Sequence, residues 1–136
     1  MLKDLRTEGL FVWYSGDMLF NRTPKWIREL PYELDKAALQ ALAKASKGPF
    51  EKPREMNFVV YDFSNIDDIT SATHQLQQAG WKCLNYEQSD EMGKFAIEAQ
   101  KNDYIINVDN YTNDVAYFHR IADLYEAKYE GWFASS

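Results

Sequence analysis

The residues of this chain most able to do chemistry are two histidines, one cysteine and one pair of adjacent acids. His74 and His119 fall in different predicted helices, and Cys83 falls in a predicted strand. No His, Cys or Asp spacing matches that of a zinc site. Asp67 and Asp68 occupy the first turn of a predicted helix, where the helix dipole accounts for two carboxylates. These residues therefore predict no catalytic group and no metal ligand.

The glycines give no sign of a nucleotide or acyl-transfer site. The sequence contains no glycine-rich phosphate loop and no Gly-x-Ser-x-Gly nucleophile elbow. We therefore predict that the protein is not an enzyme and needs no cofactor.

The charge is unevenly distributed and points to a protein partner. The net charge is −6; residues 1–55 hold 10 basic and 8 acidic residues, whereas residues 56–136 hold 5 and 13. An acidic domain is a poor ligand for nucleic acid, because phosphate contacts require a basic surface. The predicted third strand also offers only Phe95 where an RNA-recognition module needs several stacking aromatics. A basic protein is the partner that this charge predicts, with no direct contact to nucleic acid.

Aromatic and acidic residues together form the remaining candidate site. Tyrosine and tryptophan are the usual anchors of protein interfaces, and acidic charge speeds encounter with a basic partner. Each aromatic of this set is also a candidate for the core, and the sequence leaves both roles open. The candidate partner-binding residues are Trp81, Tyr86, Glu87, Asp109, Tyr129, Glu130 and Trp132.

The second part of the chain alternates strands and helices in a recognisable order. Strands are predicted at 56–63, 81–88, 94–103 and 129–136 from their β-branched, aromatic and alternating residues. One helix is expected from an N-cap at Ser64 to Gly80, and another from a cap at Asn110 or Thr112 to about 128. Gly131 is expected to let the chain turn out of that helix. The order predicts an α+β, ferredoxin-like split βαβ sandwich (βαββαβ).

The first part of the chain predicts an extension of this domain. Residues 9–15, "GLFVWYS", resemble a strand, and residues 33–47 form a strong helical pattern. Residues 46–55, with one glycine, two prolines and alternating charge, read as a connector. We therefore expect an N-terminal strand and helix extension over 1–55 and a domain over 56–136.

The compartment is predicted from what the sequence lacks. Cys83 is the sole cysteine, so no internal disulfide can form, and this suits a reducing compartment. The N-terminus does not read as a signal peptide, and no apolar run is long enough for a bilayer. We expect a cytoplasmic protein with no membrane contact.

The segment from about Met56 to Phe133 resembles the regulator of ribonuclease activity B family (RraB, ribonuclease E inhibitors). One part of the likeness is the opening strand and helix, "FVVYDFSNIDDITSATHQLQQAGWKC", and another is "YFHRIADLYEAKYEGW". The family typically ends its domain in Tyr-Asp-Gly-Trp, which Tyr129, Glu130, Gly131 and Trp132 match with Glu in place of Asp. The founding regulators also carry a long acidic C-terminal tail, and residues 1–136 include no such segment.

The resemblance implies a bacterial, ferredoxin-like, non-catalytic protein of RNA metabolism that binds ribonuclease E and lowers its activity. Two alternatives stay open. One is an immunity protein that neutralises a toxin or secreted nuclease. The other is a dimeric small-molecule-binding domain, since domains of this fold also form homodimers.

Overall fold

The structure, a computed structural model, describes residues 23–30 and 33–136. The chain divides into two compact units, with residues 53–135 forming the second and residues up to 52, together with Ser136, the first. The strand predicted at 9–15 lies outside the described residues.

The first unit contains two helices, α1 (Lys25–Arg28) and α2 (Glu33–Ala45). The helix predicted at 33–47 is therefore present and ends two residues earlier than expected. Its buried positions are Leu39, Leu42 and Ala43, whereas Ala38 is exposed. The ring of Trp26, in α1, meets that of Phe50 edge to face with centroids 6.5 Å apart.

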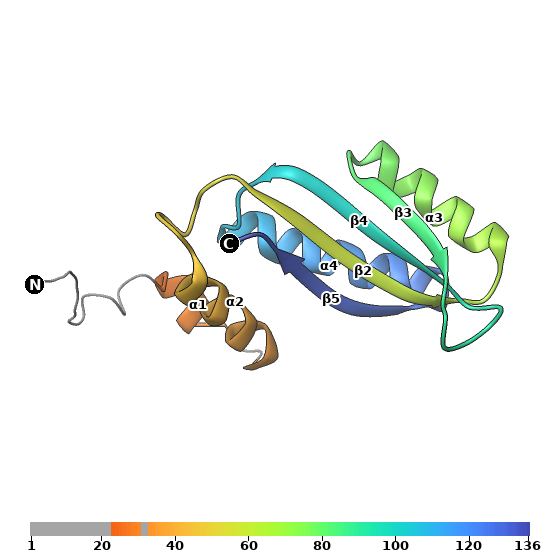
Figure 1. Cartoon of the computed structure of the whole chain (residues 1–136), viewed down its shortest axis with the longest axis horizontal. Helices are drawn as coiled ribbons and strands as arrows, with labels where there is room; N and C mark the ends of the chain where they lie inside the picture. The colour runs from red at the N-terminus through yellow and green to blue at the C-terminus, as the bar shows by residue number, and fades with distance from the viewer. Residues whose placement is uncertain (1–22, 31–32) are drawn as a thin grey trace, which may run out of the picture. The chain divides into compact units, whose positions relative to one another are not determined.

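The second unit is an α+β structure built on a four-stranded antiparallel sheet, as the sequence predicts at that level (Figure 1). The strand order in the sheet is β3-β4-β2-β5, and each neighbouring pair is antiparallel. Among the described residues, no helix has the length and hydrophobicity to cross a bilayer. The elements, in chain order, are β2 (Arg54–Phe63), α3 (Ile66–Gln78), β3 (Lys82–Glu87), β4 (Phe95–Tyr104), α4 (Val108–Leu124) and β5 (Lys128–Ala134).

Both long helices of this unit cover one face of the sheet, which leaves the other face without helices from this unit. Phe58 of β2 stacks on Phe118 of α4 at 4.5 Å between centroids. On the same side, Asn85 of β3 donates a hydrogen bond to Thr73 of α3 at 2.8 Å. Trp81 completes this core, edge to face with both phenylalanines at 5.4 and 5.0 Å. We call the opposite side of the sheet the helix-free face.

The N-caps of the two helices differ from the predicted ones. Helix α3 is capped by Asn65, whose side chain accepts from the Asp68 N–H at 2.8 Å, and not by Ser64. Helix α4 is capped by Asn107, which accepts from the Asn110 N–H at 2.8 Å. The predicted caps, Asn110 and Thr112, therefore lie inside the helix. In both cases a side-chain oxygen satisfies one of the N–H groups that a helix start leaves without an intrahelical partner.

Two positions with positive φ decide how the chain leaves its helices. Gly80 follows α3 with φ +96°, the left-handed conformation predicted for it. After α4 the left-handed residue is Glu126, at φ 55°, so the expectation that Gly131 makes this turn was wrong. Gly131 instead lies within β5 at φ +145°, where the pairing of β5 with β2 shifts register. That shift is a β-bulge, and it has consequences for the candidate site.

Candidate functional site

The bulge in β5 sends Tyr129 and Trp132 to the helix-covered face. In a regular strand these two residues, three apart, would point to opposite faces. Here Tyr129 is the partner of Val60 and Trp132 is the partner of Phe58, so both join the side of the sheet that carries α4. The Trp132 Nε1–H donates to the Tyr111 hydroxyl of α4 at 3.0 Å, and the Tyr129 ring lies 4.3 Å from that of His119.

Trp81 also belongs to the core. Its side chain is 3% exposed, and Lys101 covers its ring with the ammonium nitrogen 4.5 Å from the centroid. Trp81, Tyr129 and Trp132 therefore pack on the helix-covered side and do not reach the helix-free face.

Two other predicted residues lie apart from each other. Asp109 is exposed in the first turn of α4, which packs on the helix-covered side. Glu87 ends β3, and its carboxylate accepts from the Gly93 N–H at 2.9 Å, which closes the loop between β3 and β4. Neither residue is brought to the helix-free face.

Tyr86 and Glu130 are the predicted residues that lie on the helix-free face. Tyr86 is 42% exposed and pairs with Ala96 on β4. Burial chiefly, and then the charges of Glu98 and Glu130, raise the pKa of the Tyr86 phenol above its ordinary value. Glu98 lies on the neighbouring strand β4, opposite Leu84 and two residues from the partner of Tyr86, whereas Glu130 lies on β5 at the other edge of the sheet. At neutral pH the phenol stays protonated and can donate a hydrogen bond.

Three further residues extend this surface, and the sequence-based set did not include them. Leu84 is 61% exposed and pairs with Glu98, which in turn pairs with Val59. Phe133 is 49% exposed and pairs with Asn57, on the same face as Val59. The period of two along 94–103 already separated Glu98 from the half-buried Phe95 and the buried Ile97 and Ala99, so Glu98 was within reach of sequence reasoning. Together with Tyr86 and Glu130, these three residues form what we call the acid–aromatic surface: Leu84, Tyr86, Glu98, Glu130 and Phe133.

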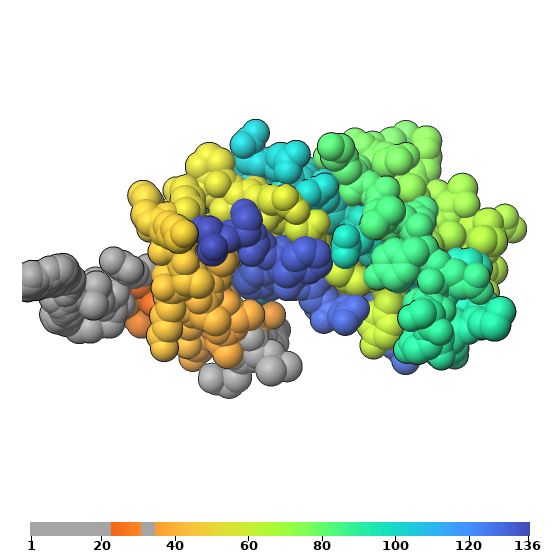
Figure 2. Space-filling view, in the orientation of Figure 1, coloured from red at the N-terminus to blue at the C-terminus, as the bar shows by residue number. Residues whose placement is uncertain are grey.

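The helix-free face is turned toward the viewer in Figures 1 and 2, where α4 passes behind the strands. In the space-filling view, the green side chains of β3 lie at the surface of this unit beside the hairpin that joins β3 to β4. The arrangement offers apolar area flanked by carboxylates. That is the composition expected of a contact for a partner with basic and apolar groups.

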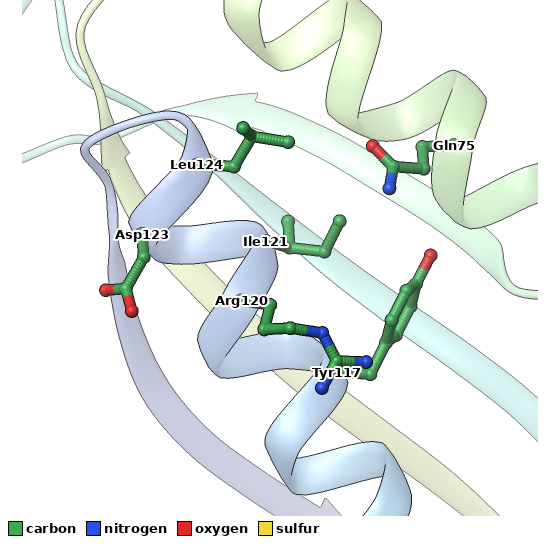
Figure 3. Close-up of a pocket in the computed structure, with 6 residues that line it drawn as sticks. All are labelled: Gln75, Tyr117, Arg120, Ile121, Asp123 and Leu124. Carbon is green, nitrogen blue, oxygen red and sulfur yellow. The ribbon is translucent and has the colours of Figure 1, made fainter.

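A groove lies between α3 and α4 on the other side of the unit (Figure 3). It has a volume of about 510 Å³, with Gln75 contributed by α3 and the rest of the lining by α4. Arg120 approaches the ring of Tyr117 with 5.8 Å between the guanidinium carbon and the centroid. Burial, foremost, raises the pKa of the Tyr117 phenol, so it is protonated at neutral pH. The remaining lining residues are Ile121, Asp123 and Leu124.

The single thiol does not form a reactive centre. Burial raises the pKa of Cys83 to about 11, so the thiol stays protonated at neutral pH. Within the part of the chain that the structure describes, no group of three His, Cys, Asp or Glu residues is placed to hold a metal ion. His74 and His119 are both exposed on their helices.

Comparison with known proteins identifies the family. The sequence model of the family described as "Regulator of ribonuclease activity B" (RraB) matches residues 33–133. The chain therefore belongs to the RraB family. The match includes α2 and therefore begins well before Met56, the residue at which the resemblance seen in the sequence begins. A search of curated proteins found no match.

Proposed function

We propose that this member of the RraB family binds a ribonuclease E-like enzyme directly and lowers its activity, with no catalytic step of its own. Family membership, over residues 33–133, carries the proposal. The acid–aromatic surface supplies the contact, in place of the wider set of residues chosen from sequence. The same proposal places the protein in the cytoplasm of a bacterium.

Charge supports a basic region of the nuclease as the contact. Residues 53–135 hold 6 basic and 14 acidic residues, a net charge of −8. On the acid–aromatic surface, Glu98 lies diagonally across the β3–β4 ladder from Tyr86, and Glu130 lies on β5 at the other edge of the sheet. Carboxylates around an aromatic anchor attract lysine and arginine side chains and speed encounter with them. Leu84 and Phe133 add apolar area that becomes buried on binding.

We also propose that residues 53–135 have the ferredoxin-like fold. The elements follow one another as strand, helix, strand, strand, helix, strand, and the sheet order is β3-β4-β2-β5. Both helices lie on one side, which is the layer arrangement of a split βαβ sandwich. Such a fold leaves one sheet face without helices of its own.

The experiment is an inhibition assay with purified components. The full chain is titrated against the ribonuclease E-like endonuclease of the same organism, and cleavage of a fluorogenic single-stranded RNA is followed. We expect inhibition that weakens as salt rises, because exposed charge pairs are screened. Absence of both inhibition and binding would refute the proposal. Binding to a basic toxin nuclease instead would support the immunity-protein alternative.

A further inference from the structure

Strand β3 is the regular edge of the described sheet. The order β3-β4-β2-β5 puts β3 and β5 at the two edges, and β5 carries the bulge at Gly131. Strand β3 pairs with β4 without a register shift, and its six residues include no proline and no positive φ. A flat, regular edge is the kind that accepts a further strand, whereas a bulge hinders pairing.

The hydrogen-bond pattern of the hairpin shows which backbone groups β3 turns outward. Gln88 N–H donates to the Lys94 carbonyl at 2.8 Å, so these residues form a hydrogen-bonded pair. Such pairs alternate along an antiparallel ladder. Even-numbered residues of β3 therefore direct their backbone groups toward β4. Cys83, Asn85 and Glu87 direct theirs toward the free edge, where no strand of the described residues pairs with them.

The two ends of β3 carry opposite charge. At its start stand Lys82 and, on the neighbouring strand, Lys101, whose ammonium nitrogen lies 4.5 Å above the Trp81 ring. At its far end stand the exposed acids of the hairpin, Glu87, Asp90 and Glu91. A lysine-rich strand added here would meet Lys82 and Lys101 at one end. A second copy of β3, running antiparallel, would instead place each acidic end beside a basic end.

We infer that the protein forms a homodimer in which β3 pairs with β3 of a second copy, antiparallel, about a two-fold axis at Asn85. This register opposes Leu84 to the second copy's Tyr86, and Tyr86 to its Leu84. These are non-hydrogen-bonded pairs across the new ladder, whose side chains stand closest. The two large apolar side chains of β3, 61% and 42% exposed, then lie side by side on the helix-free face and contact each other across the new ladder.

The register also determines which segment of the second copy lies beside the acidic loop between β3 and β4. Beyond the pair of Lys82 with Gln88, the loop residues Asp90 and Glu91 extend alongside the segment before β3 in the second copy. That segment carries Gly80, next to which the Lys101 side chain lies, and it leads into Lys82. The charge contact therefore occurs twice, once at each end of the joined strands. The two sheets become one of eight strands, and the dimer does not depend on the proposed function.

The first test is the oligomeric state of the full chain by sedimentation velocity across a concentration series. The wild type should sediment as a dimer, and Leu84→Arg should raise the dissociation constant at least roughly tenfold. Leu124→Arg is the matched control, since Leu124 is 64% exposed, close to the 61% of Leu84, and lies on α4. Circular dichroism of each variant confirms that the fold is kept.

The second test fixes the register by cross-linking. Cys83→Ser removes the natural thiol, and Asn85→Cys then places one thiol on the proposed axis. Residues opposed in a hydrogen-bonded pair have Cα atoms about 5.5 Å apart, which suits a disulfide. Mild oxidation should convert this variant to a covalent dimer, and Cys83→Ser with Leu124→Cys should stay monomeric on a denaturing gel.

Each result decides the inference. A wild type that is monomeric throughout the series overturns it. So does a dimer that Leu84→Arg leaves intact, or one in which the Asn85→Cys variant cross-links no faster than the Leu124→Cys variant. Inhibition of a ribonuclease by a monomeric wild type would refute the dimer and leave the proposed function standing.

Discussion

Trp132 and Tyr111 tie the last strand of the sheet to the longest helix. The Trp132 Nε1–H donates to the Tyr111 hydroxyl at 3.0 Å, and the two rings stand edge to face at 5.9 Å. Tyr111 is 2% exposed, so the bond lies where water competes poorly. This pair holds the end of β5 against a residue of α4 that lies 21 positions earlier in the chain.

Removing the Trp132 ring should destabilise the fold. Trp132→Ala should lower the free energy of unfolding by about 3 kcal/mol, and Trp132→Phe, which keeps much of the ring, by about 1 kcal/mol. Urea denaturation measures both. A double-mutant cycle of Trp132→Phe with Tyr111→Phe should give a coupling of about 1 kcal/mol. Additive effects would mean that the hydrogen bond contributes nothing.

Stability should fall at alkaline pH because of Tyr104. Its hydroxyl donates to the Asp114 carboxylate at 2.6 Å. Burial first, and then the hydrogen bond and charge of Asp114, raise the pKa of Tyr104 far above its ordinary 10.0. The folded protein keeps the Tyr104 proton that the unfolded chain releases above about pH 10. The contribution of this proton to the free energy of unfolding is therefore complete below that pH and is lost as pH rises.

Tyr104→Phe provides the comparison. The variant should lose stability at neutral pH, because Asp114 loses its donor, and its unfolding free energy should depend less on pH above about 10. Urea denaturation at several pH values measures both curves. Parallel curves for the wild type and the variant would contradict the assignment to Tyr104.

The cap of α3 gives a paired prediction. Asn65→Ala should cost about 1 kcal/mol, because the Asp68 N–H loses its acceptor. Ser64→Ala should cost less, because the Ser64 hydroxyl accepts from Lys94 at 3.2 Å and caps no helix. Thermal unfolding of the two variants ranks them. The reverse order would show that the cap lies at Ser64.

The periodicity of the sequence predicted the strands and helices, but it did not predict which residues cap the helices. Alternation along 94–103 predicted β4, because a half-buried strand must put apolar residues on one face. The choice between Ser64 and Asn65 could not be made, since both residue types cap helices well and stand side by side.

The candidate site was predicted least well because a bulge reverses the phase of a strand. Alternation would put Tyr129 on the same face as Phe133, but the shift at Gly131 sends Tyr129 and Trp132 together to the helix side. Tyr86 and Glu130 reach the helix-free face, and Glu98 lies on the same face, opposite Leu84.

The two positive-φ residues around β5 should respond oppositely to exchange of glycine. Gly131→Ala should cost about 1 kcal/mol from backbone strain alone, since nothing lies within 4 Å of an added Cβ at φ +145°. Glu126→Gly should be neutral or stabilising by up to about 1 kcal/mol, because Glu126 holds φ 55°. Chemical denaturation checks both. A stabilised Gly131→Ala would contradict the bulge.

Charge reversal on the acid–aromatic surface should slow binding to the nuclease. Glu98→Lys or Glu130→Lys should lower the association rate constant up to about tenfold at low salt, with a smaller effect at high salt. Asp123→Lys changes the net charge equally but lies on α4, beside the groove on the helix-covered side, and should change the rate less. Surface plasmon resonance at two salt concentrations measures all three. Equal slowing by Asp123→Lys would mean that overall charge, and not this surface, steers the partner.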